Sequence, residues 1–124
     1  MAYTGWLIEE EERANLMAYF PPRYPDVIAH HITKEFPTSK HAAPPEETEA
    51  VVIGVADDGK GIQALVCQIN GSEERPDGGV YHITWSMDIE AGYSAKMSND
   101  VIENEGWLMR DPITIKVTPK LFRY

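Results

Sequence analysis

The chain has a single cysteine, Cys67, among its 124 residues. One cysteine forms no intramolecular disulfide and builds no multi-cysteine metal site. No stretch approaches the roughly 18 uncharged apolar residues that a membrane-spanning helix needs, and the N-terminus lacks the basic start and apolar run of a signal peptide. These absences predict a cytoplasmic protein in a reducing compartment, without membrane association.

Basic residues are also scarce, with 11 Lys and Arg against 20 Asp and Glu and a net charge of −9. Such a chain repels long polyanions, because proteins grip DNA or RNA through cationic contacts with the phosphates. If the protein takes part in nucleic-acid chemistry, we therefore expect a small nucleotide or a strand end as substrate rather than a long nucleic acid. The 43% of hydrophobic residues is typical of a folded chain, and the length suits one domain over residues 1–124. The oligomeric state is left open.

Alternating apolar and polar residues predict mostly strands. A first helix is expected from Glu9 to Phe20, ended by Pro21-Pro22, and a second, short helix begins where Ser98-Asn99-Asp100 provides a cap. The segment 37–48 is expected to be an exposed loop. Short connections between the middle strands favour antiparallel pairing, which predicts an α+β fold. The expected strands are Tyr3–Ile8, Val27–Thr33, Glu49–Ala56, Ile62–Ile69, Val80–Asp88 and Ile113–Val117.

One tripeptide occurs twice, each time inside a predicted strand: His31-Ile32-Thr33 and His82-Ile83-Thr84. Residues i and i+2 of a strand point to the same face, so each imidazole stands beside a hydroxyl while the isoleucine points the other way. Two such strands side by side would present two imidazoles and two hydroxyls to one site.

This set of groups suits cleavage of a phosphodiester without a metal or another cofactor. One neutral imidazole can take a proton from the nucleophile, and one imidazolium can protonate the leaving oxygen, since an unperturbed histidine titrates near pH 6.5. The hydroxyls of Thr33 and Thr84 can donate hydrogen bonds to the phosphate oxygens. We therefore predict His31 and His82 as the catalytic residues and the two threonines as phosphate-binding residues.

The repeated motif resembles that of the 2H phosphoesterases, which contain two copies of His, apolar, Thr or Ser, apolar. His82-Ile83-Thr84-Trp85 fits completely, whereas Lys34 replaces the last apolar residue of the first copy. Pro22-Arg23-Tyr24-Pro25 precedes the first motif and Pro76-Asp77-Gly78 precedes the other. In these segments the chain resembles the compact, RNA-repair-like branch of the family. Viral proteins that degrade cyclic nucleotide signals share the double motif.

The resemblance implies a bilobed fold with pseudo-twofold symmetry, one motif per lobe and a central cleft that needs no cofactor. It implies a metal-independent phosphodiesterase that cleaves a cyclic nucleotide or cyclic oligonucleotide. One alternative is RNA-end processing at a 2′,3′-cyclic phosphate. Others are a binding protein that sequesters a nucleotide without cleaving it, and an interaction domain in which the repeat only records a duplication.

Further residues are candidates for substrate binding. Tyr24 and Tyr81 could stack on a base. Lys96, Ser98 and Asn99 lie at the predicted start of the second helix, where free N–H groups favour an anion.

The other histidines are expected to be structural or solvated. Strand alternation turns His30 away from His31, and His41 falls in the proline-rich loop. A zinc site built from all four histidines matches no usual ligand spacing, so no metal is expected. Trp85 shares the face of Ile83 and is expected in the core.

Overall fold

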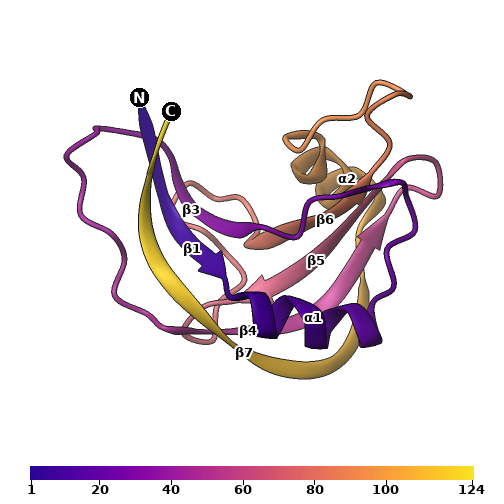
Figure 1. Cartoon of the computed structure of the whole chain (residues 1–124), viewed down its shortest axis with the longest axis horizontal. Coiled ribbons are helices and arrows are strands. Elements are labelled where there is room, and N and C mark those ends of the chain that lie inside the picture. Colours follow the sequence, from indigo (N-terminus) through magenta and orange to yellow (C-terminus); the bar gives the residue numbers. More distant parts are fainter.

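The computed structural model describes all residues, 1–124, and confirms an α+β fold with mainly antiparallel strands and two helices (Figure 1). The segments predicted as strands and helices exist in the predicted order, with one additional short strand. The elements are β1 (Ala2–Ile8), α1 (Glu10–Tyr19), β2 (Asp26–Val27), β3 (His31–Thr38), β4 (Glu49–Asp57), β5 (Ile62–Gln68), β6 (His82–Met87), α2 (Met97–Glu105) and β7 (Leu108–Arg123).

Six of the strands form a closed barrel. Their order is β6-β3-β1-β7-β4-β5, and pairing between β5 and β6 closes the ring, while β2 adds to β6 from outside. The long strand β7 curves around the barrel and pairs with β1 near one end and with β4 near the other (Figure 1). The predicted bilobed arrangement with pseudo-twofold symmetry stays a prediction.

The main hydrophobic core fills the barrel. Trp6 and Trp85 are fully buried there, as expected for Trp85, and their indole N–H groups donate to the carbonyls of Glu47 (3.0 Å) and Phe20 (2.7 Å). Leu16 of α1 joins this core. A second apolar cluster lies where Val101 and Ile102 of α2 pack with residues of β4 and β5, so α2 is fixed against the barrel wall.

The predicted hairpin between β4 and β5 is confirmed. The Asp58 carboxylate accepts hydrogen bonds from the backbone N–H groups of Lys60 and Gly61, each at 2.8 Å. Gly59 adopts φ 72°, a left-handed conformation that glycine reaches without steric cost. The polar sequence of this turn therefore determines the local structure.

The predicted strand Val27–Thr33 is wrong as a single element. β2 ends at Val27 and β3 begins at His31, because Ala29 takes a left-handed conformation with φ 43°. The N–H groups of Ile28 and Ala29 donate to the carbonyls of Trp85 and Thr84 (both 2.9 Å), so the interrupted segment still follows β6.

Other boundaries also differ from the prediction. β3 continues past Pro37 to Thr38, where a loop was expected, and β7 extends well beyond Ile113–Val117 on both sides. β6 begins at His82 and not at the predicted Val80, which instead forms an isolated bridge with Glu74. Ser98 is not a helix cap but lies inside α2. Neither helix is both long and apolar enough to cross a membrane.

Candidate active site

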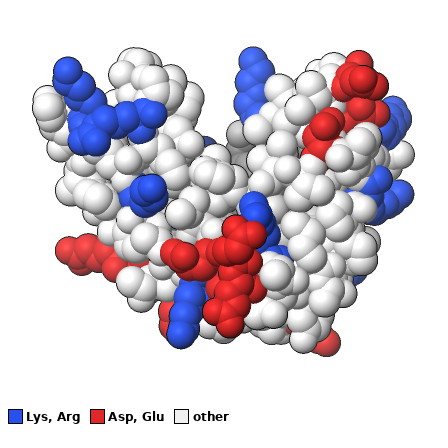
Figure 2. Space-filling view, in the orientation of Figure 1, with Lys and Arg blue, Asp and Glu red and all other residues white.

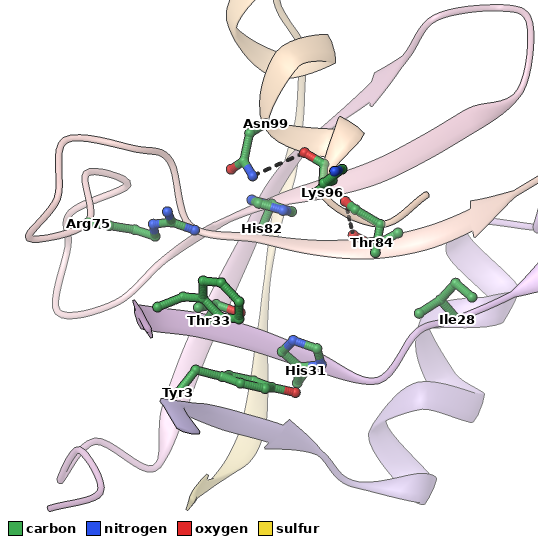
Figure 3. A pocket seen from close by; sticks show the side chains of 11 residues that line it. Tyr3, Ile28, His31, Thr33, Arg75, His82, Thr84, Lys96 and Asn99 are labelled. Atoms are coloured by element: carbon green, nitrogen blue, oxygen red, sulfur yellow. Dashed lines mark hydrogen bonds between the residues drawn. The ribbon is translucent and has the colours of Figure 1, made fainter. Parts of the chain in front are cut away.

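The two repeated motifs meet where β3 pairs with β6. Ile32 and Ile83 are register partners in this antiparallel pair, and both are fully buried in the barrel core. Alternation then turns their neighbours outward, with His31 placed across from Thr84 and Thr33 across from His82. Figure 3 shows this arrangement, with the β6 residues on one side of the cavity and the β3 residues on the other.

All four motif side chains line one cavity of about 310 Å³, as the strand periodicity predicts. Residues from β1, from the segment before β6 and from the start of α2 complete its wall. The lining residues are Tyr3, Ile28, His31, Thr33, Phe36, Arg75, His82, Thr84, Ala95, Lys96 and Asn99.

The imidazole of His82 is oriented by the backbone. Its Nδ1 lies 2.8 Å from the carbonyl oxygen of Val80, so Nδ1–H donates and Nε2 is left as the acceptor in the neutral ring. Burial lowers the pKa of His82, the hydrogen bond to Val80 opposes this effect, and the Arg75 charge lowers the pKa further. The hydrogen bond thus fixes the orientation of the ring, and Nε2 is the nitrogen left to exchange a proton with a ligand.

The imidazole of His31 has a different neighbour. Its Nδ1 lies 2.9 Å from Nδ1 of His30, so one of the two rings donates and the other accepts. Burial, followed by repulsion from His30 and His82, lowers the pKa of His31 to about 4. Burial and the neighbouring histidines thus disfavour the imidazolium form of His31 in the free protein.

The expected divergence of His30 and His31 is wrong. It assumed a continuous strand, but the left-handed Ala29 interrupts the alternation immediately before His30. The two rings meet edge to face, with centroids 5.1 Å apart. His30 is exposed and is absent from the cavity lining, so its one link to the site is the contact with His31.

The Thr84 hydroxyl is hydrogen-bonded to residues at the start of α2. Its hydroxyl lies 2.8 Å from the hydroxyl of Ser98 and 3.4 Å from the Ala95 carbonyl. Ser98 is fully buried and does not line the cavity, so it positions Thr84 rather than contacting a ligand. Lys96 and Asn99 do line the cavity, as predicted, and the Asn99 amide donates to the Lys96 carbonyl at 3.2 Å.

Two predicted aromatic residues are not in the cavity. Tyr24 lies before β2, and its hydroxyl donates to Asp57 at 2.5 Å; burial and then this hydrogen bond raise the pKa of Tyr24. Tyr81 precedes His82 and therefore points inward, where its ring meets Trp6 edge-on at 5.7 Å. Tyr3 and Phe36 supply the aromatic part of the cavity instead.

Arg75 is the main polar residue that the sequence did not predict for the site. Its side chain is only 11% exposed and is held by Asp77 through Nε (3.1 Å) and Nη2 (2.6 Å). Asp77 also accepts from the N–H of Gly79 at 2.9 Å, and a Cβ at Gly79 would lie 3.0 Å from Arg75. The composition of Pro76-Asp77-Gly78-Gly79 signals a turn, but not that the turn directs an arginine towards the cavity.

The charge of the cavity is opposite to that of the chain. Its lining contains the cations Arg75 and Lys96 and neither Asp nor Glu, although the net charge is −9. Figure 2 shows a notch at the top of the molecule with Lys and Arg on both sides of it; acidic side chains gather in the lower middle of this face and also at its upper right. Two cationic groups therefore face a ligand in the cavity, of which the Arg75 guanidinium is paired with Asp77.

Potential metal ligands are dispersed over the molecule. No three His, Cys, Asp or Glu side chains come together as a metal-ion site would require. The polar groups in the cavity lining are two imidazoles, the hydroxyls of Thr33, Thr84 and Tyr3, the Asn99 amide and two cations. Comparison of the chain with models of protein families, with curated proteins and with solved structures found no match.

Proposed function

We propose that the protein is a phosphodiesterase of the 2H type that cleaves a cyclic nucleotide or cyclic oligonucleotide. The observation that carries this proposal is the Ile32–Ile83 register pair, which places both His-x-Thr motifs on one cavity. A histidine from each motif provides the acid and the base, and neither role requires a metal ion. The cationic lining supports an anionic substrate.

The proposed reaction follows from the groups present. One neutral imidazole takes the proton of the attacking oxygen, which forms a bond to phosphorus. The bond from phosphorus to the leaving oxygen breaks, and the other histidine, protonated, gives its proton to that oxygen. The hydroxyls of Thr33 and Thr84 donate to the non-bridging oxygens, on which charge develops. Binding of the phosphate anion raises both histidine pKa values and so supplies the imidazolium that the free cavity disfavours.

Two nucleophiles fit this scheme. Water would open a 2′,3′-cyclic phosphate, whereas a ribose 2′-hydroxyl would attack its own 3′-phosphate and cut a cyclic oligonucleotide. The small cavity and the acidic chain favour a compact substrate over a long RNA, so RNA-end processing is the second candidate. A protein that only sequesters a nucleotide would need the cations and hydroxyls but not two facing imidazoles.

The proposal extends to the fold. An antiparallel strand pair has a local twofold axis, and here the axis passes between Ile32 and Ile83 and relates one motif to the other. This local symmetry supports the pseudo-twofold 2H arrangement, with β3 and β6 as equivalent strands. The departure at Lys34 leaves both histidines and both threonines on the cavity. We place the activity in the cytoplasm.

A substrate panel analysed by mass spectrometry tests the proposal. The protein is incubated with 2′,3′-cyclic mononucleotides, cyclic dinucleotides and cyclic trinucleotides, with and without EDTA. We expect cleavage of at least one cyclic substrate, unaffected by EDTA, and its loss in His31→Ala and His82→Ala. Binding without cleavage would favour sequestration. Loss of cleavage on chelation, restored by added zinc or manganese, would contradict the metal-independent mechanism.

A further inference from the structure

Four aromatic rings form a surface beside the cavity, which we call the aromatic patch: Tyr3, Phe36, Phe122 and Tyr124. Tyr3 of β1 and Phe122 of β7 are register partners whose rings stack with centroids 4.7 Å apart and planes 11° apart. Phe36 of β3 and Tyr124 stack at 5.8 Å and 3°. Two of the chain's three phenylalanines thus lie in this one place.

The aromatic patch is continuous with the two-histidine cavity. The Tyr3 ring is 5.2 Å from the His31 ring and 5.6 Å from the Phe36 ring. Tyr3 and Phe36 both line the cavity. A ligand whose phosphate lies between His31 and His82 would therefore have its remaining atoms beside these rings.

A purely structural role accounts for two of the four rings in the aromatic patch but not for the other two. Cross-strand aromatic pairs stabilise sheets, which accounts for Tyr3 and Phe122, both partly buried. Phe36 and Tyr124 are 56% and 61% exposed, so they leave much of their ring surface in water. Contiguous exposed apolar surface rimmed by polar residues is a feature of ligand-binding sites, and these two parallel rings have flat, exposed faces.

We propose that the aromatic patch binds a nucleobase of the substrate, which stacks on Phe36 and Tyr124 while its phosphate lies between the two histidines. This inference rests on the proposed function, since it assigns the base position of the same substrate. Stacking is possible for every base, and the rings of the patch carry no amide or carboxylate that would read a base edge. A purine offers the larger face, so the site prefers purine nucleotides and tolerates both adenine and guanine.

Binding of two probes of equal charge tests the inference: adenosine 5′-monophosphate and ribose 5-phosphate, which lacks the base. Calorimetry on the wild-type protein should give about fivefold or more tighter binding of the adenosine nucleotide, because stacking of a base on aromatic side chains strengthens binding by at least this factor. The double variant Phe36→Ala/Tyr124→Ala should lose this preference and keep its affinity for ribose 5-phosphate. Phe36→Leu/Tyr124→Leu, which retains apolar bulk without a π face, should also lose most of it.

Tyr19→Ala provides a matched control. Tyr19 is 67% exposed on α1 and lines a different cavity, so its removal should not alter either affinity. Circular dichroism and thermal unfolding establish that each variant is folded, which the exposure of the substituted rings favours. Equal affinities of the wild-type protein for the two probes, or a preference that survives in the double alanine variant, would overturn the inference.

The outcomes also separate this inference from the proposed function. If the base preference depends on the aromatic patch but no cyclic substrate is cleaved, the phosphodiesterase proposal fails and the base site stands. If a cyclic substrate is cleaved with the same KM by the wild-type protein and the double alanine variant, the base site fails and the phosphodiesterase proposal stands.

Discussion

The motif side chains of β6 are hydrogen-bonded to the backbone and to α2, whereas on β3 the only side-chain hydrogen bond of the motif joins His31 to the exposed His30. On β6, the Val80 carbonyl orients His82, and Ser98 fastens Thr84. On β3, His31 contacts the exposed His30 and the rings of Tyr3 and Phe122. The same tripeptide therefore supplies the same reactive groups, but its surroundings control them differently.

The β3 motif and the β6 motif, the two halves of the site, should therefore respond to different substitutions. Changes at Arg75 or Ser98 should act through the β6 groups, and changes at His30 should act through His31. If the two halves are a catalytic pair, however, removal of either histidine should have a similar effect.

The largest expected effect comes from the histidines themselves. His31→Ala and His82→Ala should each lower turnover by about a hundredfold to ten-thousandfold, because each removes a proton-transfer group. The double variant should be little worse than either single one, since both groups act on one transition state. His41→Ala is the control, because His41 is exposed in the loop between β3 and β4. Near wild-type turnover in either single variant would contradict the claim that His31 and His82 are a catalytic pair.

Arg75→Ala should lower kcat/KM by about tenfold to a hundredfold, as expected for a lost hydrogen bond to a charged phosphate. Asp77→Asn should cause a smaller loss of kcat/KM, since it weakens the hydrogen bonds that orient the Arg75 guanidinium. The control is Arg13→Ala, which removes an exposed pair with Glu10 at 2.8 Å. NMR titration should show a raised pKa of His82 in Arg75→Ala, because the Arg75 charge lowers it. An unchanged His82 pKa would contradict this placement of Arg75.

Substitution of the two threonines should affect activity alike but stability differently. Thr33→Val and Thr84→Val should each raise the barrier by about 1–2 kcal/mol, as for a lost hydrogen-bond donor. Thr84→Val should in addition lower the free energy of unfolding by about 1–2 kcal/mol, because the fully buried Ser98 loses its partner. Kinetics and chemical denaturation measure the two effects. Equal stability losses in both variants would contradict the difference in hydrogen bonding between the two halves.

Much of the site could be predicted from the sequence, because it depends on strand alternation. The repeat alone predicts that His31, Thr33, His82 and Thr84 face one side, and the buried Ile32 and Ile83 confirm the alternation. Local turn chemistry likewise predicted the hairpin at Asp58, and proline predicted the end of α1.

The rest depends on contacts between distant segments. Closure of the barrel needs pairing of β5 with β6 and of β1 with β7, and no local pattern specifies partners. The left-handed Ala29 is not signalled by its residue type, so His30 was expected to face away from His31. Arg75 reaches the cavity from the segment before β6, and Phe36 lies on β3 beyond a shift in the register between β1 and β3, which simple alternation does not predict.

His30→Gln should have the smallest effect. It removes the ring whose repulsion lowers the pKa of His31, so the pKa of His31 should rise while that of His82 stays unchanged. Two-dimensional NMR titration of the histidine rings measures both values in one sample. A shift at His82 of the same size would mean that the two halves are not controlled separately.

The dependence of kcat/KM on pH tests the central claim most directly. The rate should rise as the base loses its proton and fall as the acid loses its own, giving a bell. The pKa of His31 is lowered to about 4, and that of His82 is also lowered. We therefore predict a maximum of kcat/KM below about pH 6.5, with kcat peaking at higher pH because the bound phosphate raises both pKa values. A rate that climbs steadily to about pH 9 would contradict paired imidazoles, because no acid limb would then be required.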